Sequence, residues 1–151
     1  MQVIEQKTRY KTGEESIDRY DKNGNQVCTK HLGLETWHTY NENGNLVHIK
    51  DSEGNETWYE YDKYGNEISF KDSFNNFHHR EYNNKGNLIH FKDSNGTECW
   101  YNYDEKGNII HYKDHLMESW HKFDEYGNEI HYKDSEGNEN WTTYKYYSKE
   151  K

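Results

Sequence analysis

The sequence predicts an all-β fold, an antiparallel β-meander of tandem two-strand hairpin repeats of about 21 residues that form a twisted, curved, largely single sheet. Three observations lead to this prediction. An aromatic residue recurs every 20 or 21 residues, which indicates a repeat array. Each copy contains two turn signals separated by segments of about seven residues. The chain has no Pro and no Ala and is rich in Tyr and Trp, a composition that favours strands over helices.

The recurring aromatic residue divides the chain into copies. It stands at Tyr20, Tyr40, Tyr61, Tyr82, Tyr103, Phe123 and Tyr144. We therefore expect an N-terminal capping hairpin over residues 1–19, six tandem repeats over residues 20–143, and a C-terminal edge strand and tail over residues 144–151. Two strands per copy give about thirteen strands in all.

Two turn signals punctuate each copy. The first, Asp/Asn-x-x-Gly-Asn, is present in all six copies and predicts a type I turn followed by a bulge. The second, Asp-Ser-x-Gly-Asn, is less regular, and Asn75 replaces its Gly in one copy. Because an odd period would turn successive copies to opposite faces, we expect one connection in each copy to absorb an extra residue.

Six columns of side chains follow from the repeat. Val and Ile form one column and Phe, Tyr and Ile a second, two residues further on, so we expect both on one face of the sheet. We expect the Trp column to pack with these two, giving a one-sided aromatic core. The other face would carry the recurring Tyr residues together with the Lys and His columns.

Charge and composition limit the classes of function. The formal net charge is −9, which argues against direct nucleic-acid binding and favours a basic or neutral partner. No apolar stretch suits a membrane span or a secretory signal, so we expect no membrane association and a cytoplasmic location. Cys28 and Cys99 fall in different repeats, and we expect reduced thiols.

Catalysis and metal binding are not indicated by the residue pattern. Strand geometry keeps the His residues of one column near 10 Å apart, too far to share an ion. The carboxylates recur at turn-starting positions, which turn chemistry explains. A catalytic constellation is asymmetric, whereas an array repeats the same residues. We therefore expect no enzyme activity, no cofactor and no metal site.

The turn and aromatic spacing resembles a known repeat. Residues 61–68, Tyr-Asp-Lys-Tyr-Gly-Asn-Glu-Ile, and residues 51–54, Asp-Ser-Glu-Gly, followed by Tyr-Glu-Tyr-Asp at 59–62, are similar to the YD repeat of Rhs and teneurin-type proteins. The resemblance implies antiparallel hairpins side by side in a curving sheet. Proteins of that type close a shell with dozens of repeats around a toxin domain; six copies imply a short array without closure or toxin. A weaker resemblance is to choline-binding and glucan-binding repeats.

The function expected from these features is protein binding without catalysis. The first hypothesis is a general protein-protein interaction module. The second is a small inhibitor or immunity-type protein, anti-CRISPR-like and encoded by a bacterium, phage or mobile element, whose acidic surface blocks a basic nucleic-acid-binding effector. The third is a carbohydrate- or choline-binding module. Exposed strand edges also allow a homodimer.

Copies that depart from the pattern are the predicted places for partner binding, because the regular copies serve mainly to hold their neighbours. These positions are Phe74, Phe77, His78, His79 and Arg80 in the third copy, and Leu32, Leu34, Leu116 and Met117 in the altered loops.

Overall fold

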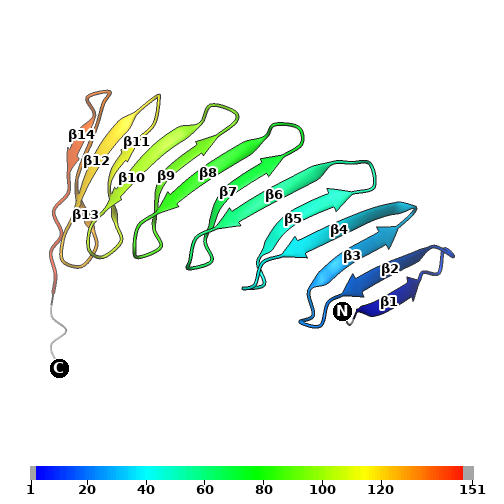
Figure 1. Ribbon diagram of the computed structural model, residues 1–151. Coiled ribbons are helices and arrows are strands. Elements are labelled where there is room, and N and C mark those ends of the chain that lie inside the picture. The colour runs from blue at the N-terminus through cyan, green and yellow to red at the C-terminus, as the bar shows by residue number, and fades with distance from the viewer. Residues whose placement is uncertain (1–2, 148–151) are drawn as a thin grey trace. The chain divides into compact units, whose positions relative to one another are not determined.

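The computed structural model describes residues 3–147, and the chain divides into two compact units, Met1–His78 and His79–Lys151. The described residues form fourteen strands and no helix, so nothing helical in this part of the chain is available to cross a membrane (Figure 1). The first unit contains β1 (Ile4–Arg9), β2 (Glu15–Tyr20), β3 (Gln26–His31), β4 (Leu34–Tyr40), β5 (Leu46–Asp51), β6 (Glu56–Tyr61) and β7 (Glu67–Asp72). The second contains β9 (Leu88–Asp93), β10 (Glu98–Tyr103), β11 (Ile109–Lys113), β12 (Glu118–Phe123), β13 (Glu129–Asp134) and β14 (Glu139–Trp141).

Each strand pairs antiparallel with the next one in the sequence. In the first unit this holds from β1 to β7, and in the second from β9 to β14. The division between the units falls within β8 (Phe77–Tyr82). The all-β hairpin meander predicted from the repeat is therefore confirmed.

The first turn of each copy has the geometry that its sequence predicts. In the turn from β4 to β5, the Gly44 N–H donates to the Asn41 carbonyl at 3.0 Å, and the Asn41 side chain accepts from the Asn43 and Asn45 N–H groups, each at 3.0 Å. Gly44 has φ of +83°, a left-handed conformation that suits glycine. The turn is thus built locally, by an Asn or Asp side chain and one glycine.

A bulge follows this turn and absorbs the extra residue of the odd period. Tyr40 is opposite Leu46, but Thr39 is opposite His48, so Val47 has no partner in the ladder. The same shift occurs after the corresponding turns between β2 and β3, β6 and β7, β10 and β11, and β12 and β13. One connection per copy therefore absorbs the extra residue, so that equivalent side chains of successive copies lie on the same face, as we expected.

The bulge also decides which columns share a face, and here the sequence-based assignment was wrong in part. Trp58 is opposite His48 and Lys71, so Trp lies with the His and Lys columns. Tyr59 is opposite Phe70, so the Phe and Tyr columns lie on the other face. The expected contact between Trp and Ile is partly retained, because the unpaired bulge residue Ile110 lines the same hollow as Trp120. We call these surfaces the Trp face and the Tyr face of each unit.

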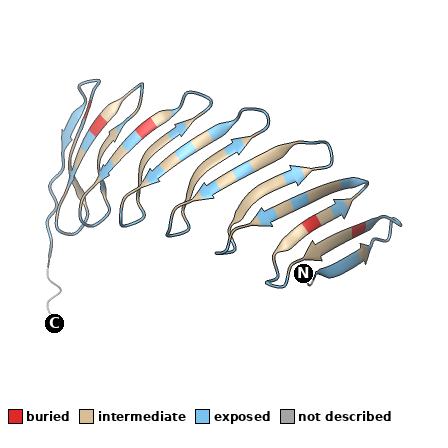
Figure 2. Ribbon diagram, viewed as in Figure 1, coloured by how far each residue is buried: buried red, intermediate tan, exposed pale blue. Residues whose placement is uncertain are grey.

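Neither face contains a thick core. Among the described residues the buried hydrophobic side chains are Cys28 and Cys99, at 4% and 5% exposed, and the buried polar ones are Ser16, Ser119 and Asp134 (Figure 2). Most aromatic side chains on the Tyr face are half-buried, against neighbours on adjacent strands. Cross-strand contacts rather than a second layer therefore stabilise the repeats.

The chain ends differ in structure. The predicted capping segment contains the hairpin of β1 and β2, in which Lys7 pairs with Glu15 at 2.7 Å. At the other end the last strand stops at Trp141, so residues 144–147 do not form the predicted edge strand, and residues 148–151 lie outside the described part. Instead, the Tyr146 ring packs on Tyr126 with centroids 4.3 Å apart.

Candidate functional site

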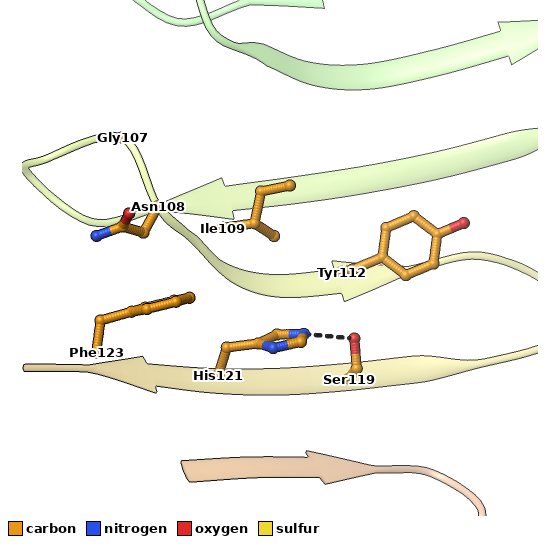
Figure 3. A pocket seen from close by; sticks show the side chains of 7 residues that line it. All are labelled: Gly107, Asn108, Ile109, Tyr112, Ser119, His121 and Phe123. Carbon is orange, nitrogen blue, oxygen red and sulfur yellow. Dashed lines mark hydrogen bonds between the residues drawn. The ribbon is translucent and has the colours of Figure 1, made fainter. Parts of the chain in front are cut away.

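The Tyr face of the second unit has an open groove between β11 and β12. It has a volume of about 550 Å³, and its lining residues are Gly107, Asn108, Ile109, Tyr112, Ser119, His121 and Phe123. Figure 3 shows the Ile109 and Tyr112 side chains of β11 directed into the same space as those of Ser119, His121 and Phe123 on β12. The groove therefore combines an aliphatic and two aromatic side chains with one imidazole and one hydroxyl.

Hydrogen bonds on both ring nitrogens fix the imidazole of His121. Its Nε2 bonds Ser119 Oγ at 3.0 Å, and its Nδ1 bonds Glu129 Oε1 at 2.5 Å (Figure 3 draws the first). The ring also packs edge-on against Tyr132, with centroids 5.2 Å apart. His121 thus presents a fixed orientation to the groove.

This Ser-His-Glu chain has the order of a hydrolase triad but lacks two requirements of that chemistry. Ser119 is 2% exposed, which shields its hydroxyl oxygen from a substrate carbonyl. β12 is paired on one side with β11 and on the other with β13, so the nearby backbone N–H groups are engaged in the sheet rather than directed at an oxyanion. The hydrogen bonds that link Ser119, His121 and Glu129 are better suited to holding a binding surface rigid.

Tyr112 is held in a similar way at the other end of the groove. Its hydroxyl donates to Asp114 Oδ2 at 2.7 Å. This hydrogen bond raises the pKa of Tyr112 to about 12, so the hydroxyl stays protonated and remains a donor. The same interaction lowers the pKa of Asp114.

The Trp face carries a different, repeated arrangement. His48 stacks on Trp58 and bonds Glu56, which also bonds Lys50. The arrangement of Lys, Glu, His and Trp recurs twice in the second unit, as Lys92, Glu98, His90 and Trp100, and as Lys113, Glu118, His111 and Trp120. We call each such set of four residues a tetrad. Its carboxylate is paired with the Lys ammonium and the imidazole on the same surface.

The tetrads lower the pKa values of their carboxyl groups. Hydrogen bonds from Lys50 and then His48 lower the pKa of Glu56. The bond from His90 is the main cause for Glu98, and the bond from His111 for Glu118. These glutamates therefore stay ionised below the usual range for Glu.

The residues predicted to bind a partner belong to both units. In the first unit Phe74 and Leu32 are 68% and 66% exposed at turns, Leu34 is 54% exposed at the start of β4, and Phe77 is 41% exposed at the start of β8. His78 bonds Glu67 at 2.5 Å and stacks on Phe70.

The remaining predicted positions lie in the second unit. His79 is exposed and lies 3.6 Å from Glu81 Oε1, and Arg80 lies over the Phe91 ring. Leu116 is 77% exposed and Met117 is half-buried in the short turn after β11. Whether these positions bind a partner stays a prediction.

Sequence reasoning missed the groove because its residues occupy regular repeat positions. One signal was present: His121 stands where two other copies have Tyr59 and Tyr101, next to Ser119 in the alternating pattern. Among residues 3–147 no group of three or more His, Cys, Asp or Glu side chains is arranged to hold a metal ion.

Comparison with known proteins agrees with this architecture. The family model described as Teneurin YD-shell matches residues 1–150. The chain belongs to the teneurin YD-shell family. No curated protein matches the sequence. The YD-shell repeat is a structural module, and the resemblance to YD repeats drawn from the turn spacing is confirmed.

Several solved structures share the fold of this YD-shell array. The Photorhabdus luminescens Tc holotoxin pore matches with a TM-score of 0.53 and 16% identity over 81% of this chain. The TcdB2-TccC3-Cdc42 and TcdB2-TccC3 structures each match with a TM-score of 0.52 and 16% identity, over 84% and 85% of this chain. This chain spans only 7%, 7% and 8% of those three chains. At this identity the likeness shows the fold alone.

Proposed function

We propose that this YD-shell array is a non-enzymatic module that binds a protein partner through the groove on the Tyr face of its second unit. The observation that carries the proposal is the groove itself, about 550 Å³ and lined by Ile109, Tyr112 and Phe123 around the fixed imidazole of His121. Half-exposed aromatic and aliphatic side chains beside oriented polar groups are typical of the centre of a protein interface.

The ligand that suits this groove is a peptide segment with an apolar side chain. Ile109 is 38% exposed and supplies apolar surface that a partner would remove from water. His121 and Tyr112 are already oriented by hydrogen bonds, so little conformational entropy is lost when they contact a ligand.

The two other functions considered from the sequence have less support. An inhibitor that imitates nucleic acid needs free carboxylates, yet Glu56, Glu98 and Glu118 are paired with Lys and His on the Trp face. A sugar or choline site needs open indole faces, yet an imidazole covers one face of Trp58 and one of Trp100.

Selection of short peptides from a random phage-displayed library on the full chain tests the proposal. We expect enrichment of sequences with an aromatic or aliphatic anchor. The variant Ile109→Glu places a charge in the groove, and the repeat accepts Glu there, because Glu67 and Glu129 occupy the same position in other copies. It should weaken the selected peptides about tenfold or more, a loss of about 1.4 kcal/mol.

Leu88→Glu is the matched control, because it makes the same change at the same repeat position on β9, away from the groove. It should leave peptide affinity unchanged. The proposal is wrong if no apolar peptide is enriched, or if both variants weaken the peptides equally.

A further inference from the structure

The Trp face of the second unit has an open hollow of its own, on the opposite face from the groove proposed to bind a peptide. It has a volume of about 530 Å³, and its lining includes Trp120 and Lys122 of β12 and His131 and Lys133 of β13. Trp120 is directly opposite Lys133, and Lys122 is directly opposite His131, so the four side chains project from one face of this strand pair. The hollow therefore combines an indole, an imidazole and two ammonium groups.

Lys122 stands where another copy places a hydrogen-bond partner for the facing histidine. One repeat earlier this position is Asn102, directly opposite His111, and the Asn102 amide lies 3.4 Å from the Nδ1 of His111. Lys122 is opposite His131 in the same way but carries a positive charge. Among residues 3–147 the Nδ1 of His131 makes no hydrogen bond, and its Nε2 bonds Glu139. The hollow thus has a cation where the pattern has an acceptor.

The two lysines of the hollow have no carboxylate partner in the part of the chain that the structure describes. In the three tetrads the lysine at the position of Lys133 lies 2.8–3.6 Å from the glutamate of the next strand. Lys133 and Glu139 are directly opposite each other but form no such contact. Asp104 also lines the hollow, but both of its carboxylate oxygens accept hydrogen bonds from its own turn. The hollow is therefore a place of excess positive charge in a chain with a net charge of −9.

The indole of Trp120 forms an apolar wall of the hollow. It is 39% exposed, and His111 stacks on it with ring centroids 5.5 Å apart. Because His111 is on β11, this stacking leaves the indole surface on the β13 side to line the hollow. Ile110 and Ile130, which the bulges leave unpaired, add aliphatic surface.

We propose that this hollow binds a small aromatic anion, with its phosphate or carboxylate group between Lys122 and Lys133 and its ring against Trp120. The two lysines occupy diagonal positions of the strand pair, about 7–8 Å apart, which leaves room for an oxyanion between their ammonium groups. Charge-assisted hydrogen bonds from lysine suit both kinds of oxyanion. The indole offers the ring a flat apolar surface for stacking.

The chain itself shows that an oxyanion oxygen fits beside the histidine of this column. Glu81 has the repeat position of Lys122, and its Oε1 lies 3.3 Å from the Nδ1 of His90. His90 has the repeat position of His131. An anion held by Lys122 brings its oxygen to the equivalent point, so the ligand supplies the acceptor that Glu81 supplies elsewhere.

Titration of the isotope-labelled full chain with phenyl phosphate, followed by NMR at the Trp120 indole N–H in about 0.15 M salt, tests the site. We expect a saturable shift of the Trp120 signal. Benzoate, titrated in parallel, shows which oxyanion is preferred, and a saturable shift with either ligand supports the proposal. The absence of a saturable shift with both ligands overturns it.

Two substitutions each remove one ammonium group from the hollow. Lys122→Asn and Lys133→Gln should each weaken binding about two- to fivefold, as expected for an exposed ion pair. Lys71→Gln is the matched control, because Lys71 has the repeat position of Lys133 but lies in the first unit, outside the hollow. It should leave the affinity unchanged, and an equal loss would overturn the proposal, since net charge alone would then explain binding. Thermal unfolding verifies that the three variants fold.

Inorganic phosphate and phenol are the control ligands, because each retains one half of phenyl phosphate. Both should bind several-fold more weakly than phenyl phosphate. The proposal is wrong if inorganic phosphate binds as tightly, since the indole wall would then contribute nothing. It is also wrong if phenol binds as tightly, since the two lysines would then contribute nothing.

Discussion

The imidazole of His48 lies stacked against the indole of Trp58, with ring centroids 5.4 Å apart and planes 19° apart. Both rings project from directly paired positions on β5 and β6. The same His is bonded to Glu56, so aromatic stacking and a hydrogen bond act on one ring. Because each contact recurs in several copies, the small stabilising contributions of such contacts add up along the array.

Acid should destabilise the fold through the tetrad glutamates. Hydrogen bonds from Lys50 and His48 lower the pKa of Glu56, and those from neighbouring His and Lys lower the pKa of Glu98 and Glu118. A pKa lowered by folding contributes stability above the ordinary Glu value of 4.5, and this stability is lost as the pH falls through the folded-state value. Urea unfolding at neutral pH and near pH 3 should show the loss.

The combined variant Glu56→Gln, Glu98→Gln and Glu118→Gln is the control for this pH dependence. This variant should be less stable at neutral pH, and its free energy of unfolding should fall less on acidification. An unchanged acid response in the variant would assign the effect to the turn aspartates instead, several of which also have lowered pKa values.

Gly54→Ala should reduce the free energy of unfolding by about 1–2 kcal/mol. Gly54 has φ of +91°, and no atom lies within 4 Å of the added Cβ, so the cost is conformational rather than steric. Gly54→Asn should cost less, because Asn75 holds the same turn position with φ of +67°. Chemical denaturation measures the free energy of unfolding of the two variants. Equal losses of stability in Gly54→Ala and Gly54→Asn would contradict the explanation.

His38→Phe should increase the free energy of unfolding by about 1 kcal/mol. Among the described residues, His38 Nδ1 is buried without a hydrogen-bond partner, in a position where other copies have Tyr59 and Tyr101. The matched control is His121→Phe at the same repeat position. Both ring nitrogens of His121 are bonded, so that variant should be destabilised. Thermal unfolding measures both variants. If their melting temperatures shift in the same direction relative to the original chain, this account is wrong.

Tyr146→Phe should raise the pKa of Asp124. Burial raises this pKa, but hydrogen bonds from Tyr146 and Asn128 outweigh it and lower the pKa to about 2. The stabilisation from this contact is therefore present above the ordinary Asp value of 3.8 and is lost as the pH falls toward 2. NMR titration of the Asp124 carboxyl carbon measures the change. Tyr147→Phe, at a residue 85% exposed, should leave the titration as it is.

The turns could be predicted from the sequence because their determinants are local. An Asp or Asn side chain that bonds the backbone two and four residues later, with a Gly two residues before the strand resumes, sets the turn without help from distant residues. The replacement of Gly by Asn75 was also interpretable, because Asn reaches the left-handed region.

The grouping of columns could not be predicted in full, because it depends on where the bulge lies. The sequence indicates that one connection absorbs a residue, but it does not say that Val47 is the one that loses its partner. A shift of one residue exchanges the faces of a strand. The groove at Ile109 and Phe123 also depends on the bulge, since the groove exists only once the faces are assigned.

The sequence by itself determined the repeat, its strands and its turns, since each depends on residues close together in the chain. Only the tertiary structure decided that Trp58 shares a surface with His48 and Lys71, and that Tyr59 lies opposite Phe70. These relations arise from pairing between strands, whose register depends on which residue is left unpaired at the bulge. Local chemistry thus determines the elements, and the register between them determines which surfaces are open to a partner.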